Sequence, residues 1–132
     1  MAKVLIIDDS RALILTVTMV LQKAGHEVTV CKDATKAAGV SLTDKFDAIL
    51  CDICMPSHSG LEVVRESREL DGYRDTPILM LTADSSTKNK IFAKKSGATG
   101  WIIKPFLTER LISTINKIET FAQRPYYCSP MT

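Results

Sequence analysis

The sequence predicts an α/β domain with a doubly wound parallel sheet of five strands flanked by five helices. Short apolar runs recur along the chain, and they are continuous rather than alternating, which is typical of strands covered on both faces. Between these runs lie longer segments with the apolar spacing of amphipathic helices. Because parallel neighbours are joined by right-handed helical crossovers, this alternation favours one doubly wound sheet.

The predicted elements follow one another at regular spacing. The candidate strands are residues 4–7, 28–30, 48–51, 78–81 and 101–103. The first helix has an apolar stripe at Leu13, Val17 and Leu21, behind a candidate N-cap at Ser10, and Gly25 is its candidate stop. The other helices are expected within residues 34–42, 61–68, 85–96 and 108–118.

Length and composition predict one globular domain and exclude several classes of protein. The 132 residues, 45% of them hydrophobic and 24% charged, fit a single domain at residues 1–122, with a non-periodic C-terminal tail at 123–132. A net charge of +2 is too small to predict direct nucleic-acid binding. No apolar run approaches the roughly 18 to 20 residues of a membrane span, so we expect no membrane insertion.

The cysteines indicate a reducing compartment. Four cysteines at irregular spacing do not form the framework of a disulfide-rich secreted domain. The N-terminus also lacks the features of a signal peptide. We therefore expect a cytoplasmic protein, and the initial Met1 and the tail favour a complete chain over a piece of a longer regulator.

Chemically reactive side chains follow four of the five predicted strands. Asp8 and Asp9 follow the first strand, Asp52 the third, Thr82 the fourth and Lys104 the fifth. Ligands of open parallel sheets bind beyond the carboxyl ends of the strands, where the strand order reverses. These five side chains converge there if the first and third strands are neighbours.

Such a cluster suits phosphoryl chemistry on a carboxylate. Three packed carboxylates repel one another, and Mg²⁺, which prefers oxygen ligands, is the natural compensation. Lys104 adds a mobile positive charge and Thr82 a hydroxyl donor, both suited to a phosphoryl oxygen. A carboxylate is an established nucleophile for forming an aspartyl phosphate. Alone, each of these residues is also an ordinary turn or cap residue; their joint placement carries the prediction.

At this point the sequence resembles the receiver domains of two-component response regulators, above all the single-domain, CheY-like members with a flavodoxin-like fold. The matching residues span about residues 1–121 and are Ile7-Asp8-Asp9-Ser10, Asp52-Ile53-Cys54-Met55-Pro56, Ser59-Gly60-Leu61, Thr82-Ala83 and Lys104-Pro105-Phe106. The resemblance implies the strand order 2-1-3-4-5, which makes the first and third strands neighbours.

The resemblance also assigns roles within the site. Asp52 is implied as the phosphoacceptor, Asp9 as a direct Mg²⁺ ligand, Asp8 as a ligand through water, and the backbone carbonyl of Cys54 as the third protein ligand. The donor is implied to be the phosphohistidine of a sensor histidine kinase or a phosphotransfer domain. The protein is then a phosphoacceptor switch that catalyses only its own phosphorylation and dephosphorylation, not an enzyme acting on other substrates.

Further roles belong to the switch. Thr82 is implied to bind the phosphoryl group and Lys104 to pair with it, after a cis bond to Pro105. Trp101 takes the aromatic switch position, which turns inward when Thr82 moves. That position is usually Tyr, Phe or His, so the bulkier Trp101 departs from the pattern. A further departure is Cys54, which, with Asp84, occupies positions that tune hydrolysis of the phosphoryl group.

The output partner is expected on the face formed by the fourth helix, fifth strand and fifth helix. A run of lysines on the fourth helix is either a solvated face or an attraction for an acidic partner: Lys88, Lys90, Lys94 and Lys95. His58 in the loop after Asp52 is either an exposed loop residue or part of the mouth of the site. The sequence names neither the kinase nor the output protein.

Three other functions compete with the switch. A phosphorelay intermediate would pass the phosphoryl group on to a histidine phosphotransfer domain. An aspartyl-phosphate hydrolase would need a second Asp two residues after the nucleophile, where this chain has Cys54. A redox protein would use Cys51 and Cys54 as a C-x-x-C pair, but Cys51 lies inside a predicted strand, which favours packing over redox chemistry.

Overall fold

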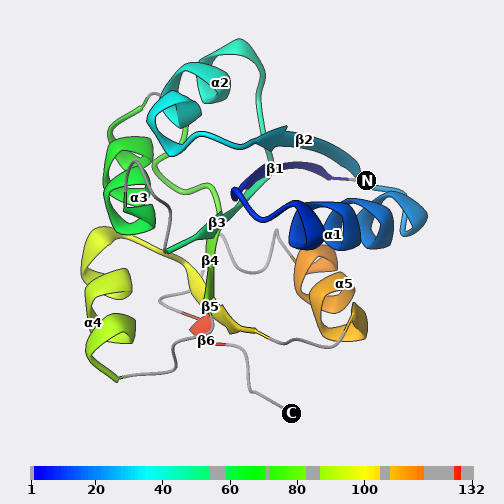
Figure 1. Ribbon diagram of the computed structural model, residues 1–132. Coiled ribbons are helices and arrows are strands. Elements are labelled where there is room, and N and C mark those ends of the chain that lie inside the picture. The colour runs from blue at the N-terminus through cyan, green and yellow to red at the C-terminus, as the bar shows by residue number, and fades with distance from the viewer. Residues whose placement is uncertain are drawn as a thin grey trace.

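The computed structural model describes residues 2–53, 59–70, 72–82, 87–104, 108–117 and 127–128, and it confirms the predicted alternation of strands and helices (Figure 1). The strands are β1 (Lys3–Ile7), β2 (Glu27–Cys31), β3 (Ala48–Asp52), β4 (Ile78–Thr82), β5 (Gly100–Ile103) and β6 (Tyr127–Cys128). The helices are α1 (Arg11–Lys23), a 3₁₀ turn η1 (Ala34–Lys36), α2 (Ala37–Thr43), α3 (Gly60–Glu69), α4 (Thr87–Ser96) and α5 (Thr108–Asn116).

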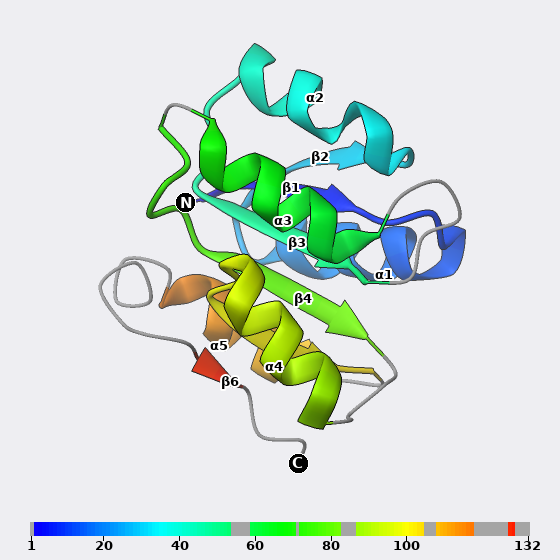
Figure 2. The same cartoon turned by 90° about the vertical axis from the view of Figure 1, so that its left-hand side faces the viewer.

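The strands form one parallel sheet in the order β2-β1-β3-β4-β5-β6. The first five strands therefore have the expected order 2-1-3-4-5, and β1 is the neighbour of β3. Helices α2, α3 and α4 cover one face of the sheet, and α1 and α5 cover the other (Figures 1 and 2). The fold is thus three layers, with both faces of the sheet covered.

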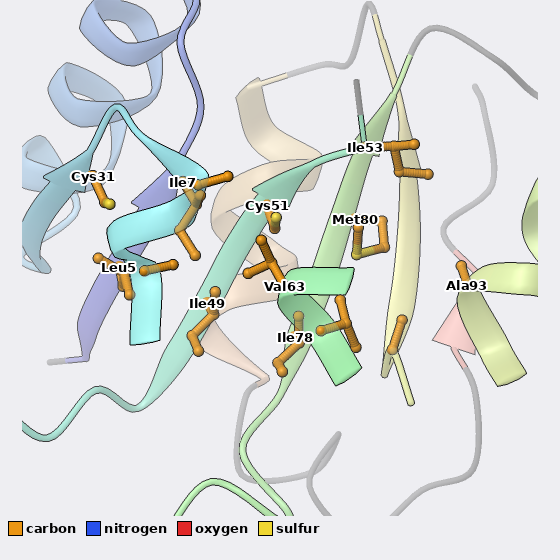
Figure 3. Close-up of a cluster of buried hydrophobic side chains, with 14 of the residues drawn as sticks. Leu5, Ile7, Cys31, Ile49, Cys51, Ile53, Val63, Ile78, Met80 and Ala93 are labelled. Carbon is orange, nitrogen blue, oxygen red and sulfur yellow. The ribbon is translucent and has the colours of Figure 1, made fainter. Parts of the chain in front are cut away.

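The core consists of two clusters, one on each face of the sheet. Successive strand residues point to opposite faces, so Leu5 and Ile7 join one cluster while Val4 and Ile6 join the other. The first cluster packs under α2, α3 and α4 (Figure 3). Every residue of β3 and β4 is buried, which explains why both are apolar without alternation up to their last residues, Asp52 and Thr82.

Helix starts next to the site are fixed by serine caps. The Ser10 hydroxyl accepts a hydrogen bond from the Leu13 amide at 3.4 Å, as the sequence predicted, and begins α1. The Ser59 hydroxyl accepts one from the Leu61 amide at 3.2 Å and begins α3. Both helices begin just beyond strands β1 and β3, so their N-termini lie at the edge where the reactive residues gather.

At the end of the sheet opposite the reactive residues, Arg68 joins α3 to the loops that precede β4 and β5. Its guanidinium donates to the carbonyls of Gly97, Tyr73 and Thr76 and to the hydroxyl of Thr99. The acceptors precede β4 and β5, so this one side chain holds α3 against both strand starts. Burial lowers the pKa of Arg68, opposed by the nearby Asp75 carboxylate.

The C-terminal segment adds a strand that the sequence did not predict. Residues 123–132 were expected to be a tail without regular structure, yet Tyr127–Cys128 pairs in parallel with Gly100–Trp101 of β5. A strand of two residues is too short to produce a periodic pattern, which is why the sequence gave no indication of it. Among the described residues, no helix has both the length and the apolar character that crossing a membrane requires.

Candidate functional site

The acidic residues predicted to converge do so at the carboxyl ends of β1 and β3. Ile7 and Cys51 are paired in register, so the residues that follow them, Asp8 and Asp52, lie at the same level of the sheet. Carboxylate oxygens of Asp8, Asp9 and Asp52 all lie within 4.8 Å of one another. This is close enough for one cation to be shared by the three side chains.

Lys104 supplies the positive charge of the cluster. Its Nζ lies 3.6 Å from Asp8 Oδ2 and 3.6 Å from Asp52 Oδ1, which is near enough for electrostatic attraction but too long for hydrogen bonds. Its backbone amide donates to the carbonyl of Thr82 at 2.7 Å, so the ends of β4 and β5 are fixed relative to each other. Thr82, the last residue of β4, is 3% exposed.

The donor set fits Mg²⁺. Asp8 is fully buried, and its Oδ1 accepts the Ser10 amide at 2.8 Å, whereas its Oδ2 has no hydrogen-bond partner among the described residues. Lys104 Nζ, at 3.6 Å, is too far away to hydrogen-bond this oxygen, so the oxygen can still accept a metal ion or a water molecule. Asp9 is exposed, so a Mg²⁺ ion bound there could keep the several water ligands that it usually retains.

Cys51 is unsuited to redox chemistry. Its side chain is fully buried, and burial, followed by the carboxylates of Asp52 and Asp8, raises the pKa of the thiol far above its usual range. Cys31 lies on the same face, but Ile7 of β1 is paired with both cysteines and separates them by two strand spacings, about 10 Å. That distance excludes a disulfide between them.

Sequence reasoning missed two contributions to the site. The Ser10 amide binds Asp8, and an aspartate that bonds the amide two residues later was a readable signal in Asp8-Asp9-Ser10. Gly60, the first residue of α3, lies against the backbone of Asp52: a Cβ built on it would be 2.1 Å from the Asp52 carbonyl oxygen. Gly60 was noted only as the residue before a predicted helix and as part of the family pattern, because sequence does not show how closely two backbone segments approach.

Trp101, the expected switch residue, is already buried. Its side chain is fully buried in the cluster under α2, α3 and α4, and its backbone pairs with Met80. Its indole Nε1–H has no hydrogen-bond partner among the described residues. Trp101 is therefore buried in this structure, and its role as the switch residue stays a prediction.

Several predicted residues lie outside the described part of the chain: Cys54, His58, Asp84 and Pro105. Their roles as metal ligand, site-mouth residue, tuning residue and cis-bonded residue stay predictions.

The chain is similar in sequence to response regulators. A model of the response regulator receiver domain matches residues 4–116. Protein PilH of Pseudomonas aeruginosa is 30% identical over 118 residues, which are 89% of this chain and 98% of that protein. Response regulator ArlR of Staphylococcus saprophyticus is 32% identical over 115 residues, which are 87% of this chain but 51% of that relative, so the chain spans about half its length.

Solved structures agree with the sequence matches. The chemotaxis protein CheY4 of Vibrio cholerae superposes with a TM-score of 0.85 at 42% identity, covering 89% of this chain and 98% of that one. A putative response regulator from Chloroflexus aurantiacus has a TM-score of 0.85 at 28% identity, covering 90% and 98%. With its parallel sheet and its aspartate cluster at the strand ends, the chain belongs to the response regulator receiver domain family.

Proposed function

We propose that the chain acts as a single-domain response regulator that accepts a phosphoryl group on Asp52 from the phosphohistidine of a sensor kinase or a phosphotransfer domain. Receiver domains are phosphoacceptor switch domains that bind Mg²⁺ at an aspartate cluster and interact with histidine kinases and downstream targets. The observation that supports the assignment in this chain is the position of Lys104 Nζ, 3.6 Å from carboxylate oxygens of both Asp8 and Asp52.

In the proposed reaction, a carboxylate oxygen of Asp52 attacks the phosphorus of phosphohistidine. The new O–P bond forms as the N–P bond breaks, and the electron pair returns to the imidazole, which takes up a proton. Lys104 pairs with a phosphoryl oxygen and the Thr82 hydroxyl donates to another, so both side chains stabilise the charge that develops during transfer. A metal ion held by Asp8, Asp9, Asp52 and the Cys54 carbonyl would neutralise the remaining negative charge.

The switch follows from the same residues. When Thr82 moves to the phosphoryl group, the space beside β5 changes, and Trp101 is held in its buried position. The surface of α4, β5 and α5 then docks the output partner, because a partner that prefers one state shifts the equilibrium toward it. Hydrolysis, tuned by Cys54 and Asp84, resets the switch. The proposal places these events in the cytoplasm, as the cysteine content predicts.

The direct test is phosphorylation by a small donor. On incubation with acetyl phosphate and Mg²⁺, the chain is expected to gain the mass of one phosphoryl group, and the fluorescence of Trp101, the only tryptophan, is expected to change. With EDTA present from the start in place of Mg²⁺, neither signal should appear, because Lys104 alone then compensates the repulsion among the carboxylates. Equal phosphorylation with and without Mg²⁺ would contradict the metal site.

Replacing Lys104 with Met is expected to slow phosphorylation about 100-fold, the effect of removing one preorganised group that stabilises developing charge. The measurement is the initial rate of mass gain with acetyl phosphate at fixed Mg²⁺. The matched control is Lys32→Met, because Lys32 is an exposed lysine that follows the carboxyl end of β2 outside the cluster. Similar rates for the two variants would show that Lys104 takes no part in transfer.

A further inference from the structure

Helix α4 concentrates positive charge that the proposed function leaves unexplained. Its ten residues include four lysines and no acidic side chain. The whole chain has a net charge of +2, so the residues outside this helix together have a net charge of −2. Lys94 and Lys95 are exposed, and neither forms an ion pair with another described residue.

The same helix exposes two large apolar side chains. Ile91 is 47% exposed and Phe92 is 43% exposed. Ala93, the next residue, is fully buried in the cluster that packs against the sheet (Figure 3). Because successive residues of a helix are about 100° apart, Ile91 points away from the sheet and Phe92 lies on one flank of the helix.

The apolar and basic side chains form one surface, the α4 patch, which consists of Ile91, Phe92, Lys94 and Lys95. Lys94 and Lys95 follow Ile91 by three and four residues, so they are its neighbours on the helix surface. Lys95 also follows Phe92 by three residues. No described helix or strand covers the outer side of α4 in either view of the molecule (Figures 1 and 2).

A structural role explains only part of the α4 patch. Lysines in the last turn of a helix interact favourably with its dipole, which is sufficient reason for Lys94 and Lys95. It does not explain the exposure of Ile91 and Phe92, because the outer face of a helix that contacts only water is polar. An apolar patch with a charged rim indicates an interaction site.

We propose that the α4 patch binds an acidic protein segment that carries apolar anchor residues. Carboxylates of this segment pair with Lys94 and Lys95, and its apolar side chains cover Ile91 and Phe92. The proposal rests on the proposed function only where it identifies the segment as part of the output partner. Binding to the patch itself requires neither Asp52 nor Mg²⁺.

The composition of the α4 patch favours this occupant over three others. A nucleic acid would pair with the lysines, but its bases stack on aromatic side chains and would leave Ile91 without a matching contact. An anionic membrane binds helices with a much longer apolar face than two side chains. A second copy of this chain, docked patch to patch, would bring lysines of like charge together.

The first test identifies the segments that the α4 patch selects. A display library of random peptides of about 15 residues, the length at which an isolated helix begins to be stable, is selected on the full chain without a phosphodonor. The selected peptides should be enriched both in Asp and Glu and in large apolar residues. Binding of a synthetic copy should weaken as the salt concentration rises, because exposed ion pairs are screened.

The second test locates the binding of that synthetic peptide on the chain. The double variant Lys94→Glu/Lys95→Glu should bind it at least about tenfold more weakly, since each exposed ion pair lost accounts for about threefold. Ile91→Ser/Phe92→Ser should also weaken binding at least about tenfold, because the buried apolar contact is lost.

Two matched control variants separate the α4 patch from general effects of charge and of exposed apolar surface. Lys32→Glu/Lys36→Glu makes the same change in net charge on two exposed lysines outside α4. Leu15→Ser/Met19→Ser removes the exposed large apolar side chains of α1. Both controls should bind the peptide as tightly as the unmodified chain does.

Three results would overturn the proposal. The library yields no peptide that binds the unmodified chain more tightly than it binds Lys94→Glu/Lys95→Glu. The selected peptides lack acidic residues. Vesicles of anionic lipid or single-stranded DNA, but no peptide, bind in a manner that depends on Lys94 and Lys95. Phosphorylation of Asp52 by acetyl phosphate is measured separately on the unmodified chain, so either proposal can fail while the other stands.

Discussion

Replacing Asp52 with Asn is expected to abolish phosphorylation while making the metal-free protein more stable. The amide is not a nucleophile of the required kind, so acetyl phosphate and Mg²⁺ should add no phosphoryl group. The same change removes one of three carboxylates whose oxygens lie within 4.8 Å of one another. Because the single positive charge of Lys104 offsets only part of the repulsion among three carboxylates, the free energy of unfolding should rise by about 1 kcal/mol.

The two effects are measured on the same samples, by mass spectrometry and by urea denaturation in EDTA. The control is Glu69→Gln, a neutralisation of an exposed carboxylate at the last residue of α3, away from the cluster, which should leave phosphorylation unchanged and stability within about 0.5 kcal/mol. An Asp52→Asn chain that still gained a phosphoryl group would show that the acceptor is misassigned. Reduced stability would instead show that the cluster is not electrostatically strained.

Magnesium gives an independent reading of this strain. An ion that binds only the folded state stabilises it by an amount that grows with its concentration relative to its dissociation constant. Mg²⁺ should therefore stabilise the unmodified chain clearly and the Asp52→Asn chain much less. As the Mg²⁺ concentration rises, the free energy of unfolding of the unmodified chain should therefore overtake that of the Asp52→Asn chain. A general effect of salt on surface charges would instead raise both by the same amount.

The sheet and the convergence of the site could be predicted because both depend on short-range patterns. Fully buried strands such as β3 and β4 leave continuous apolar runs, and a polar residue directly after such a run lies at the carboxyl edge of a parallel sheet. Asp52, Thr82 and Lys104 were located in this way. The adjacency of β1 and β3 came from the family resemblance and not from the residues, since no local pattern records which strands are neighbours.

Contacts between residues that are far apart in the sequence could not be predicted. Arg68 resembles any arginine on an amphipathic helix, yet it binds three carbonyls and one hydroxyl in the loops that precede β4 and β5. The pairing of β6 with β5 involves two residues and leaves no periodic pattern. The buried position of Trp101 depends on how α4 packs over β5, which a sequence pattern does not specify.

Gly60 is the position where such a contact should have the largest effect on stability. A Cβ at Gly60 would lie 2.1 Å from the carbonyl oxygen of Asp52 and 2.7 Å from Cα of Ile53. Both are backbone atoms, so no side chain can turn aside, and α3 would have to move away from the end of β3. Gly60→Ala is therefore expected to lower the free energy of unfolding by about 3 kcal/mol, the upper range for overpacking a closely packed contact.

The same displacement would move Asp52 relative to Lys104, so the rate of phosphorylation should fall together with stability. The control is Gly39→Ala in α2, where a Cβ would meet no atom within 4 Å. Because alanine is favoured over glycine inside a helix, this control should be neutral or more stable by about 0.5 to 1 kcal/mol. If Gly60→Ala were as stable as Gly39→Ala and were phosphorylated at the normal rate, the close approach of α3 to β3 would have no part in positioning the acceptor. The expected result would link the start of α3, where Gly60 lacks a methyl group, to the position of Asp52, the proposed acceptor.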